Sequence, residues 1–192
     1  MRFSRGVMAA CSAGALIAGG LQMPQVMAQS STGGFDLFQQ RWTNREGFKP
    51  LYYFLTRTRP NQRSTYFLLI KKKDRDRAIM KLDVTIPSYF KAKIETKNIR
   101  FAYCEAGSVS KRTKCGETIP ASISLNNDGK LIEIVPTAPV PTDRTIGVEL
   151  QVRNPYGRGM YQFNALAQAP GDVPMAGYLG SWVIEITDGI DG

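Results

Sequence analysis

The most constraining feature of this sequence is a series of short runs rich in Val, Ile, Tyr, Phe and Thr, separated by Pro, Gly, Asn and Asp. Runs of this composition favour β-strands, and the separating residues favour turns. The sequence predicts nine strands, over residues 51–56, 65–71, 79–86, 98–103, 119–125, 131–135, 145–152, 160–167 and 178–187. The pattern therefore predicts an all-β fold, an immunoglobulin-like sandwich of two sheets.

Two of the predicted strands indicate which of their faces is buried. Apolar residues alternate with polar or small ones in residues 145–152 and 178–187, and the apolar positions are Ile146, Val148, Leu150, Val152, Trp182, Ile184 and Ile186. Alternation of this kind turns one face of a strand toward a core. Each of these strands therefore needs a facing sheet.

The amino terminus has the pattern of an export signal. Arg2 and Arg5 precede an uncharged run over residues 6–21, and Val26 and Ala28 supply the small residues of a cleavage site. The run is shorter than the roughly 20 apolar residues that span a membrane. We expect a signal peptide over residues 1–28, and a mature chain without a transmembrane segment that works in the periplasm, the outer cell envelope or outside the cell. Residues 29–63 then form an N-terminal extension with room for one strand, and residues 64–192 form the sandwich.

Two cysteines remain after the predicted cleavage, Cys104 and Cys115. Export to an oxidising compartment predicts a disulfide between them. The alternatives are two unpaired thiols or a metal site, and two thiolates in a chain without His do not complete a zinc site.

Charge is unevenly distributed along the chain. Residues 29–115 hold 19 Lys and Arg against 7 Asp and Glu, whereas residues 116–192 hold 4 against 9. The basic half predicts an anionic partner. For an exported protein the candidates are acidic polysaccharide, lipid head groups or an envelope protein, and we do not expect nucleic acid.

The most basic stretch is the run over residues 71–77, whose cations are Lys71, Lys72, Lys73, Arg75 and Arg77. We interpret these five residues as a candidate anion-binding site. The alternative is a solvated loop that protects a sheet edge. Two further groups would extend a basic patch if the strands bring them together: Arg57, Arg59 and Arg63, and Lys111, Arg112 and Lys114.

The chain contains no His, which removes the commonest general base and metal ligand. We therefore do not expect an enzyme, a cofactor or a metal site. One catalytic alternative stays open, an exported carbohydrate-active hydrolase that uses two carboxylates. The acids on predicted strands or beside them are Asp83, Glu95, Glu133, Glu149 and Glu185.

Several motifs appear in the order seen in one family. They are Pro139-Val140-Pro141, Val148-Glu149-Leu150, Arg153-Asn154-Pro155, Gly159 to Phe163, Ala169-Pro170-Gly171 and Tyr178-Leu179-Gly180, with Tyr66-Phe67, Ile99 to Phe101 and the Asp128 to Ile134 hairpin upstream. Together they resemble the cyanobacterial domain of unknown function 2808 (DUF2808), over roughly residues 64–187. The resemblance implies a small exported protein from a cyanobacterial host, and it transfers no functional residue.

These observations predict an exported binding or structural module of the cell envelope. Besides the hydrolase, a second alternative is a subunit or chaperone of a surface assembly that donates or accepts an edge strand. Within the motif around residue 153, Arg153, Tyr156 and Arg158 are candidates for lining a ligand groove.

Overall fold

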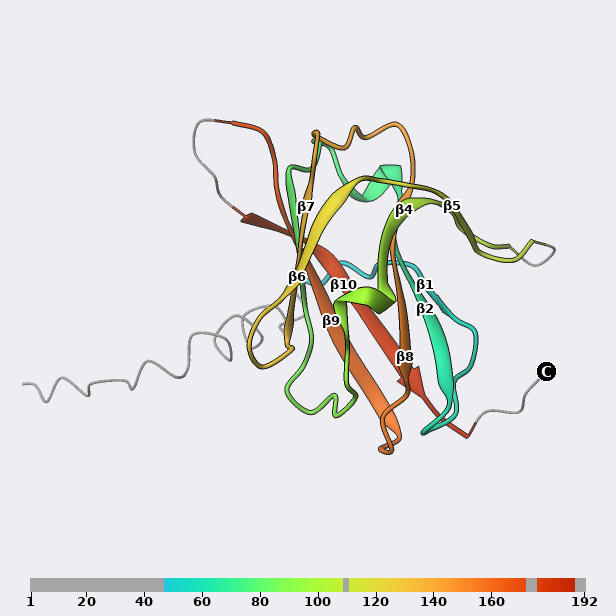
Figure 1. Ribbon diagram of the computed structural model, residues 1–192. Helices are drawn as coiled ribbons and strands as arrows, with labels where there is room; N and C mark the ends of the chain where they lie inside the picture. Colours follow the sequence, from blue (N-terminus) through green and yellow to red (C-terminus); the bar gives the residue numbers. More distant parts are fainter. Residues whose placement is uncertain (1–46, 109–110, 172–175, 189–192) are drawn as a thin grey trace, which may run out of the picture. The chain divides into compact units, whose positions relative to one another are not determined.

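The computed structural model describes residues 47–108, 111–171 and 176–188. In this part of the chain, ten strands form two five-stranded sheets, and neighbouring strands are antiparallel (Figure 1). Sheet I contains, in spatial order, β1 (Tyr53–Leu55), β2 (Arg63–Ile70), β8 (Ile146–Arg153), β4 (Ile99–Glu105) and β5 (Lys114–Thr118). Sheet II contains β10 (Ala176–Ile186), β9 (Gly159–Gln168), β3 (Lys81–Thr85), β7 (Leu131–Pro136) and β6 (Ala121–Leu125). Two short 3-10 helices, η1 (Lys72–Asp74) and η2 (Thr96–Asn98), connect strands.

The predicted two-sheet β-sandwich is confirmed, and each of the nine predicted strands overlaps an observed one. The additional strand is β5, whose sequence Lys-Cys-Gly-Glu-Thr has no apolar alternation. The strand predicted over residues 51–56 corresponds to β1, which lies within the span of the expected N-terminal extension. The expected signal peptide lies outside the described residues.

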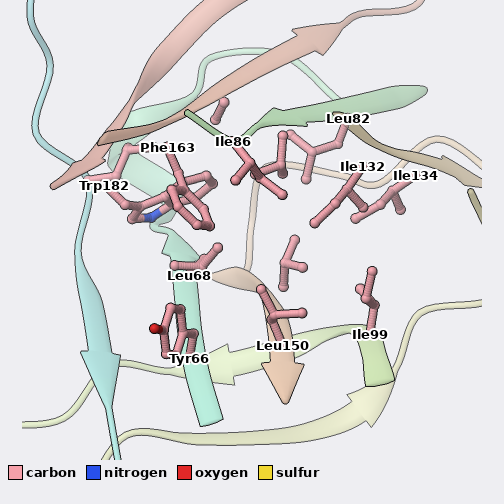
Figure 2. Close-up of a cluster of buried hydrophobic side chains, with 14 of the residues drawn as sticks. Tyr66, Leu68, Leu82, Ile86, Ile99, Ile132, Ile134, Leu150, Phe163 and Trp182 are labelled. Carbon is pink, nitrogen blue, oxygen red and sulfur yellow. The ribbon is translucent and has the colours of Figure 1, made fainter. Parts of the chain in front are cut away.

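The core lies between the two sheets and is made by the alternating apolar positions of their strands. Figure 2 shows Tyr66, Leu68 and Leu150 of sheet I facing Phe163 and Trp182 of sheet II. Trp182 is fully buried, and its indole N–H donates a hydrogen bond to the Leu69 carbonyl at 3.1 Å. One side chain thereby ties sheet II to the backbone of sheet I.

The segment before β1 joins the edges of both sheets. The Leu51 N–H donates to the Ser181 carbonyl of β10 at 2.8 Å, and the Leu69 N–H of β2 donates to the Tyr52 carbonyl at 2.9 Å. Gly180 permits this crossing, because its φ is +156° and a Cβ there would lie 2.6 Å from the Lys49 carbonyl oxygen. The crossing carries the chain from the edge of sheet II into β1, the edge strand of sheet I.

A disulfide joins β4 to β5 at the other edge of sheet I. Cys104 and Cys115 are direct partners in the β4–β5 register, and the predicted disulfide between them is confirmed. The Cys104 sulfur covers Gly147 of β8, where an added Cβ would lie 2.7 Å from it. Glycine at position 147 thus lets the disulfide pack directly on the sheet.

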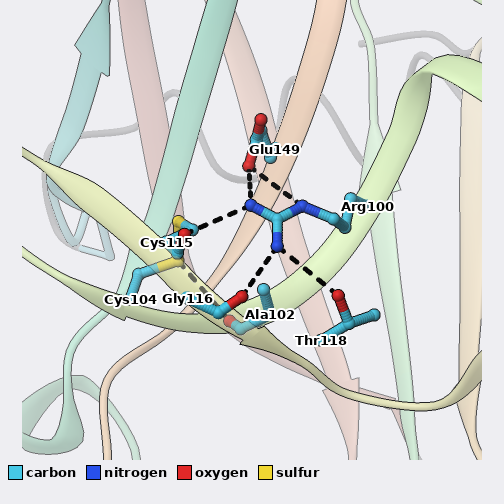
Figure 3. A network of polar contacts seen from close by, with 7 residues as sticks. All are labelled: Arg100, Ala102, Cys104, Cys115, Gly116, Thr118 and Glu149. Carbon is cyan, nitrogen blue, oxygen red and sulfur yellow. Dashed lines mark hydrogen bonds and ion pairs between the residues drawn. A yellow bond between two sulfur atoms is a disulfide. The ribbon is translucent and has the colours of Figure 1, made fainter.

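Arg100 holds β5 in place by several polar contacts, which Figure 3 shows. Its guanidinium forms an ion pair with Glu149 of β8 and donates to the carbonyls of Gly116 and Cys115 at 2.8 and 3.3 Å. These contacts replace the apolar packing that β5 lacks. The guanidinium is therefore engaged within the fold.

Reduction of the disulfide is expected to lower the free energy of unfolding by about 3 kcal/mol, because a link between cysteines 11 positions apart no longer restricts the unfolded chain. Urea denaturation with and without reductant measures this difference. Cys104→Ser/Cys115→Ser serves as the control, since its stability should not respond to reductant. Equal stability of the oxidised and reduced wild type would contradict the prediction.

Candidate anion-binding site

The basic run over residues 71–77 contains η1, and its cations differ in their exposure and contacts. Lys72, Lys73 and Arg77 are exposed. The Lys71 ammonium lies 4.3 Å from the centre of the Tyr52 ring, a cation–π contact. The run therefore presents three solvated cations, with Lys71 turned toward β1.

Arg75, the fifth predicted member of the anion site, is buried and acts within the fold. Its guanidinium donates hydrogen bonds to the carbonyls of Val140, Pro141 and Arg144 at 2.9, 2.5 and 3.0 Å. Burial lowers the pKa of this group from its ordinary value. The side chain is 6% exposed, so its charge is directed to backbone carbonyls rather than to solvent.

A second group of cations lies at the opposite end of β2. We name it the basic groove, a cavity of about 650 Å³ whose charged lining residues are Arg63, Lys91, Lys93, Glu95, Lys97 and Arg153. It forms because β8 pairs with β2 as far as Arg153 but with β4 only as far as Leu150. The segment over residues 91–98, which leads into β4, supplies the opposite wall.

The positive charge of the basic groove is only partly neutralised. Glu95 pairs with both Lys93 and Lys97, at 2.8 and 3.0 Å, and these hydrogen bonds lower the pKa of Glu95 to about 2. Arg63 and Arg153 are direct cross-strand partners, and Arg153 donates to the Asn61 carbonyl at 2.6 Å. Within the described residues, Arg63, Lys91 and Arg153 have no acidic partner in an ion pair.

Asn154 fixes the wall of the groove at the end of β8. Its buried side chain accepts a hydrogen bond from the Tyr66 hydroxyl at 2.7 Å and donates to the carbonyls of Arg57 and Arg59 at 3.2 and 2.7 Å. Burial raises the pKa of the Tyr66 phenol well above its usual range, which keeps it a donor. Asn154 thus ties β8, β2 and the β1–β2 connection into one rigid rim.

The three residues expected to line a groove around position 153 are divided between two places. Arg153 and Tyr156 line the basic groove, and Tyr156 is 79% exposed. Arg158 instead forms an ion pair with Asp188. Sequence reasoning did not identify Lys91, Lys93 and Lys97 as site residues, because isolated lysines in a connecting segment carry no motif.

A second, smaller cavity of about 300 Å³ lies beside β1, and we name it the Tyr52 hollow. Its lining includes Tyr52, Phe54, Lys111 and Arg112. The Tyr52 hydroxyl lies 3.1 Å from the Thr113 hydroxyl, so the arm between β4 and β5 reaches across to β1. The hollow therefore brings together the basic run, through Lys71, and two cations of the disulfide loop.

The acids on which a hydrolase would depend are mostly engaged with cations. Asp83 and Glu133 are direct partners on β3 and β7, and Lys81 contacts both, at 3.3 and 2.6 Å. Burial raises the pKa of Asp83, whereas a hydrogen bond from Lys81 lowers the pKa of Glu133. The pair lies on the outer face of sheet II with an ammonium between its members.

No cluster of three or more His, Cys, Asp or Glu side chains in the described ranges is suited to hold a metal ion. No helix in the same ranges has the length and apolar character needed to span a membrane.

Solved structures similar to this chain include three bacterial proteins. The collagen-binding domain of a Staphylococcus aureus adhesin has 11% identity and a TM-score of 0.40, with 69% of this chain and 93% of that chain covered. The bacterial hydrophobin BslA has 16% identity and a TM-score of 0.44, with coverage of 72% and 97%. ACE19, the collagen-binding subdomain of the Enterococcus faecalis surface protein ACE, has 10% identity and a TM-score of 0.41, with coverage of 70% and 95%.

No functionally curated protein matches the chain. A family model does match, over residues 42–186, and its description is "Protein of unknown function (DUF2808)". The matched span contains all ten strands described above. The family description assigns no role to any residue of this chain.

Proposed function

Because the chain belongs to the DUF2808 family, whose function is unknown, we propose from its own residues that it is an exported cell-envelope module that binds an acidic polysaccharide. The binding site of this proposal is the basic groove. Its charged lining comprises five cations and one acid, and that acid is already paired with two of the cations.

The observation that carries the proposal is the pairing of Arg63 with Arg153. They stand directly opposite each other on β2 and β8, and both line the same cavity. Like charges in this arrangement repel each other and cost stability. The hydrogen bond from Arg153 to the Asn61 carbonyl leaves both charges in place, and an anionic ligand would relieve their repulsion.

The test is retention of the protein on immobilised polygalacturonate across a salt series. Arg63→Gln/Lys91→Gln is expected to weaken retention about tenfold at low salt, because two unpaired cations are lost, and wild-type retention should fall steeply as salt rises. Urea denaturation should show that this variant is as stable as the wild type.

The matched control is Lys72→Gln/Lys73→Gln, which removes the same charge from the exposed basic run. If the control loses retention and the groove variant does not, the basic run is the anion site and the proposed groove is wrong. If neither variant differs from the wild type, or if retention ignores salt, an acidic polysaccharide is not the ligand.

A further inference from the structure

The Tyr52 hollow and the basic groove adjoin on the outer face of sheet I. Side chains alternate along β1 and its flanking residues, so Tyr52, Phe54 and Thr56 share one face. Tyr52 and Phe54 line the hollow, whereas Thr56 lines the groove. Successive residues on this face therefore pass from one cavity to the other without an intervening strand.

A pair of aromatic side chains lies on this face at the Tyr52 hollow. Phe54 and Phe67 are direct partners on β1 and β2, and their ring centres are 6.0 Å apart. Phe54 is 37% exposed although it is a large apolar side chain. Exposed aromatic rings of this kind provide an apolar face on which a sugar ring can stack.

The same row of the sheet carries no unpaired acid that would repel an anion. Phe67 is opposite Glu149, and Glu149 is in turn opposite Arg100. The ion pair between Arg100 and Glu149 neutralises that carboxylate. The centre of the face is therefore aromatic and electrically balanced, with cations at both ends.

The cations at the hollow end come from two parts of the chain. Lys111 and Arg112 line the hollow, and the Lys71 ammonium lies over Tyr52. Lys111 pairs with the exposed Glu105, and within the described residues Arg112 has no ion-pair partner. Contact between Tyr52 and Thr113 holds this group of cations beside the aromatic pair.

We propose that the outer face of sheet I binds an extended acidic polysaccharide along one continuous track. Sugar rings stack on Phe54 and Phe67, while acidic groups contact the basic groove at one end and Lys111 and Arg112 at the other. Arg63 and Leu69, which mark the two ends on β2, are six residues apart, or about 20 Å. This inference rests on the proposed function, and it adds that the ligand must be long enough to reach both cavities.

The experiment measures the affinity of the full protein for oligogalacturonates of increasing length, from dimers to dodecamers, by titration calorimetry. We expect affinity to rise with length until the track is filled and then to level off. Phe54→Ala is expected to weaken binding of long oligomers about fivefold and to leave dimers unaffected. Lys111→Gln/Arg112→Gln should behave like Phe54→Ala: it should weaken binding of long oligomers and leave binding of dimers unaffected.

Two control variants and the groove variant Arg63→Gln/Lys91→Gln distinguish failure of the track from failure of the proposed function. Val135→Ala removes an exposed apolar side chain of sheet II, and Lys72→Gln/Lys73→Gln removes two exposed cations; both should bind like the wild type. If the two track variants bind long oligomers normally while Arg63→Gln/Lys91→Gln binds them weakly, the track is wrong and the groove remains the site. If the groove variant also binds normally, the proposed function itself is wrong.

Discussion

Arg75→Ala is expected to lower the free energy of unfolding by roughly 3–4 kcal/mol, because it removes a buried cation that serves three backbone carbonyls. Those carbonyls belong to residues 140–144, a segment between β7 and β8. Pro139 and Pro141 have no N–H to donate, so the segment has few hydrogen-bond donors of its own. Equilibrium urea denaturation of variant and wild type measures the loss.

Arg77→Ala is the matched control for this prediction. It removes the same charge two residues further on, from an exposed side chain, and its effect should stay within about 0.5 kcal/mol. Equal effects of the two substitutions would show that water can replace the Arg75 guanidinium. A larger loss of stability in Arg75→Ala than in Arg77→Ala would show that Arg75 stabilises the fold, although in the sequence it stands in a run of otherwise solvated cations.

Asn154→Ala is expected to lower the free energy of unfolding by a similar amount, roughly 3–4 kcal/mol, because the buried Tyr66 hydroxyl loses its acceptor and the carbonyls of Arg57 and Arg59 lose the Asn154 amide as a donor. The Arg57 carbonyl still accepts a hydrogen bond from the Ser64 hydroxyl at 2.8 Å. The Tyr66 hydroxyl is the most costly of these groups, since it lies in the core and water does not reach it readily. Tyr66→Phe removes that hydroxyl and should cost about 1–2 kcal/mol. Chemical denaturation of both variants gives the comparison.

Asn127→Ala is the matched control for Asn154→Ala, because Asn127 is exposed in the turn between β6 and β7. It should change stability by less than about 0.5 kcal/mol. Asn154→Ala should also weaken binding to acidic polysaccharide, since Asn154 holds the rim of the basic groove. A stable Asn154→Ala variant would mean that the rim is held by its backbone contacts alone, such as the Asn154 N–H to the Gln62 carbonyl at 2.8 Å.

The sandwich could be predicted from local pattern because its buried face repeats along each strand. Ile146, Val148 and Leu150 are all fully buried, as their alternation predicts. The disulfide could be predicted because an expected export signal would leave only Cys104 and Cys115 in an oxidising compartment. β5 could not, because its place in sheet I depends on Arg100 and the disulfide rather than on its own apolar residues.

For the candidate site, the sequence predicted only that the basic half of the chain would meet an anionic partner. Four of the five groove cations, Arg63, Lys91, Lys93 and Lys97, do come from that half, but they are spread over 35 positions. Arg153 comes from the acidic half and joins them through the β2–β8 register. The run over residues 71–77 looked like the stronger site because its cations are consecutive, and consecutive charges are visible without a structure.

Local patterns in the sequence were enough to predict the fold class, nine of the ten described strands, the cysteine pair and the basic character of residues 29–115. These properties depend on neighbours along the chain, such as the alternation of apolar residues within a strand. The three-dimensional structure was needed to show which cations share a surface, that Arg75 is buried, and that Phe54 and Thr56 line two different basic cavities. Each of these depends on strand order and register, which bring residues together from distant parts of the sequence.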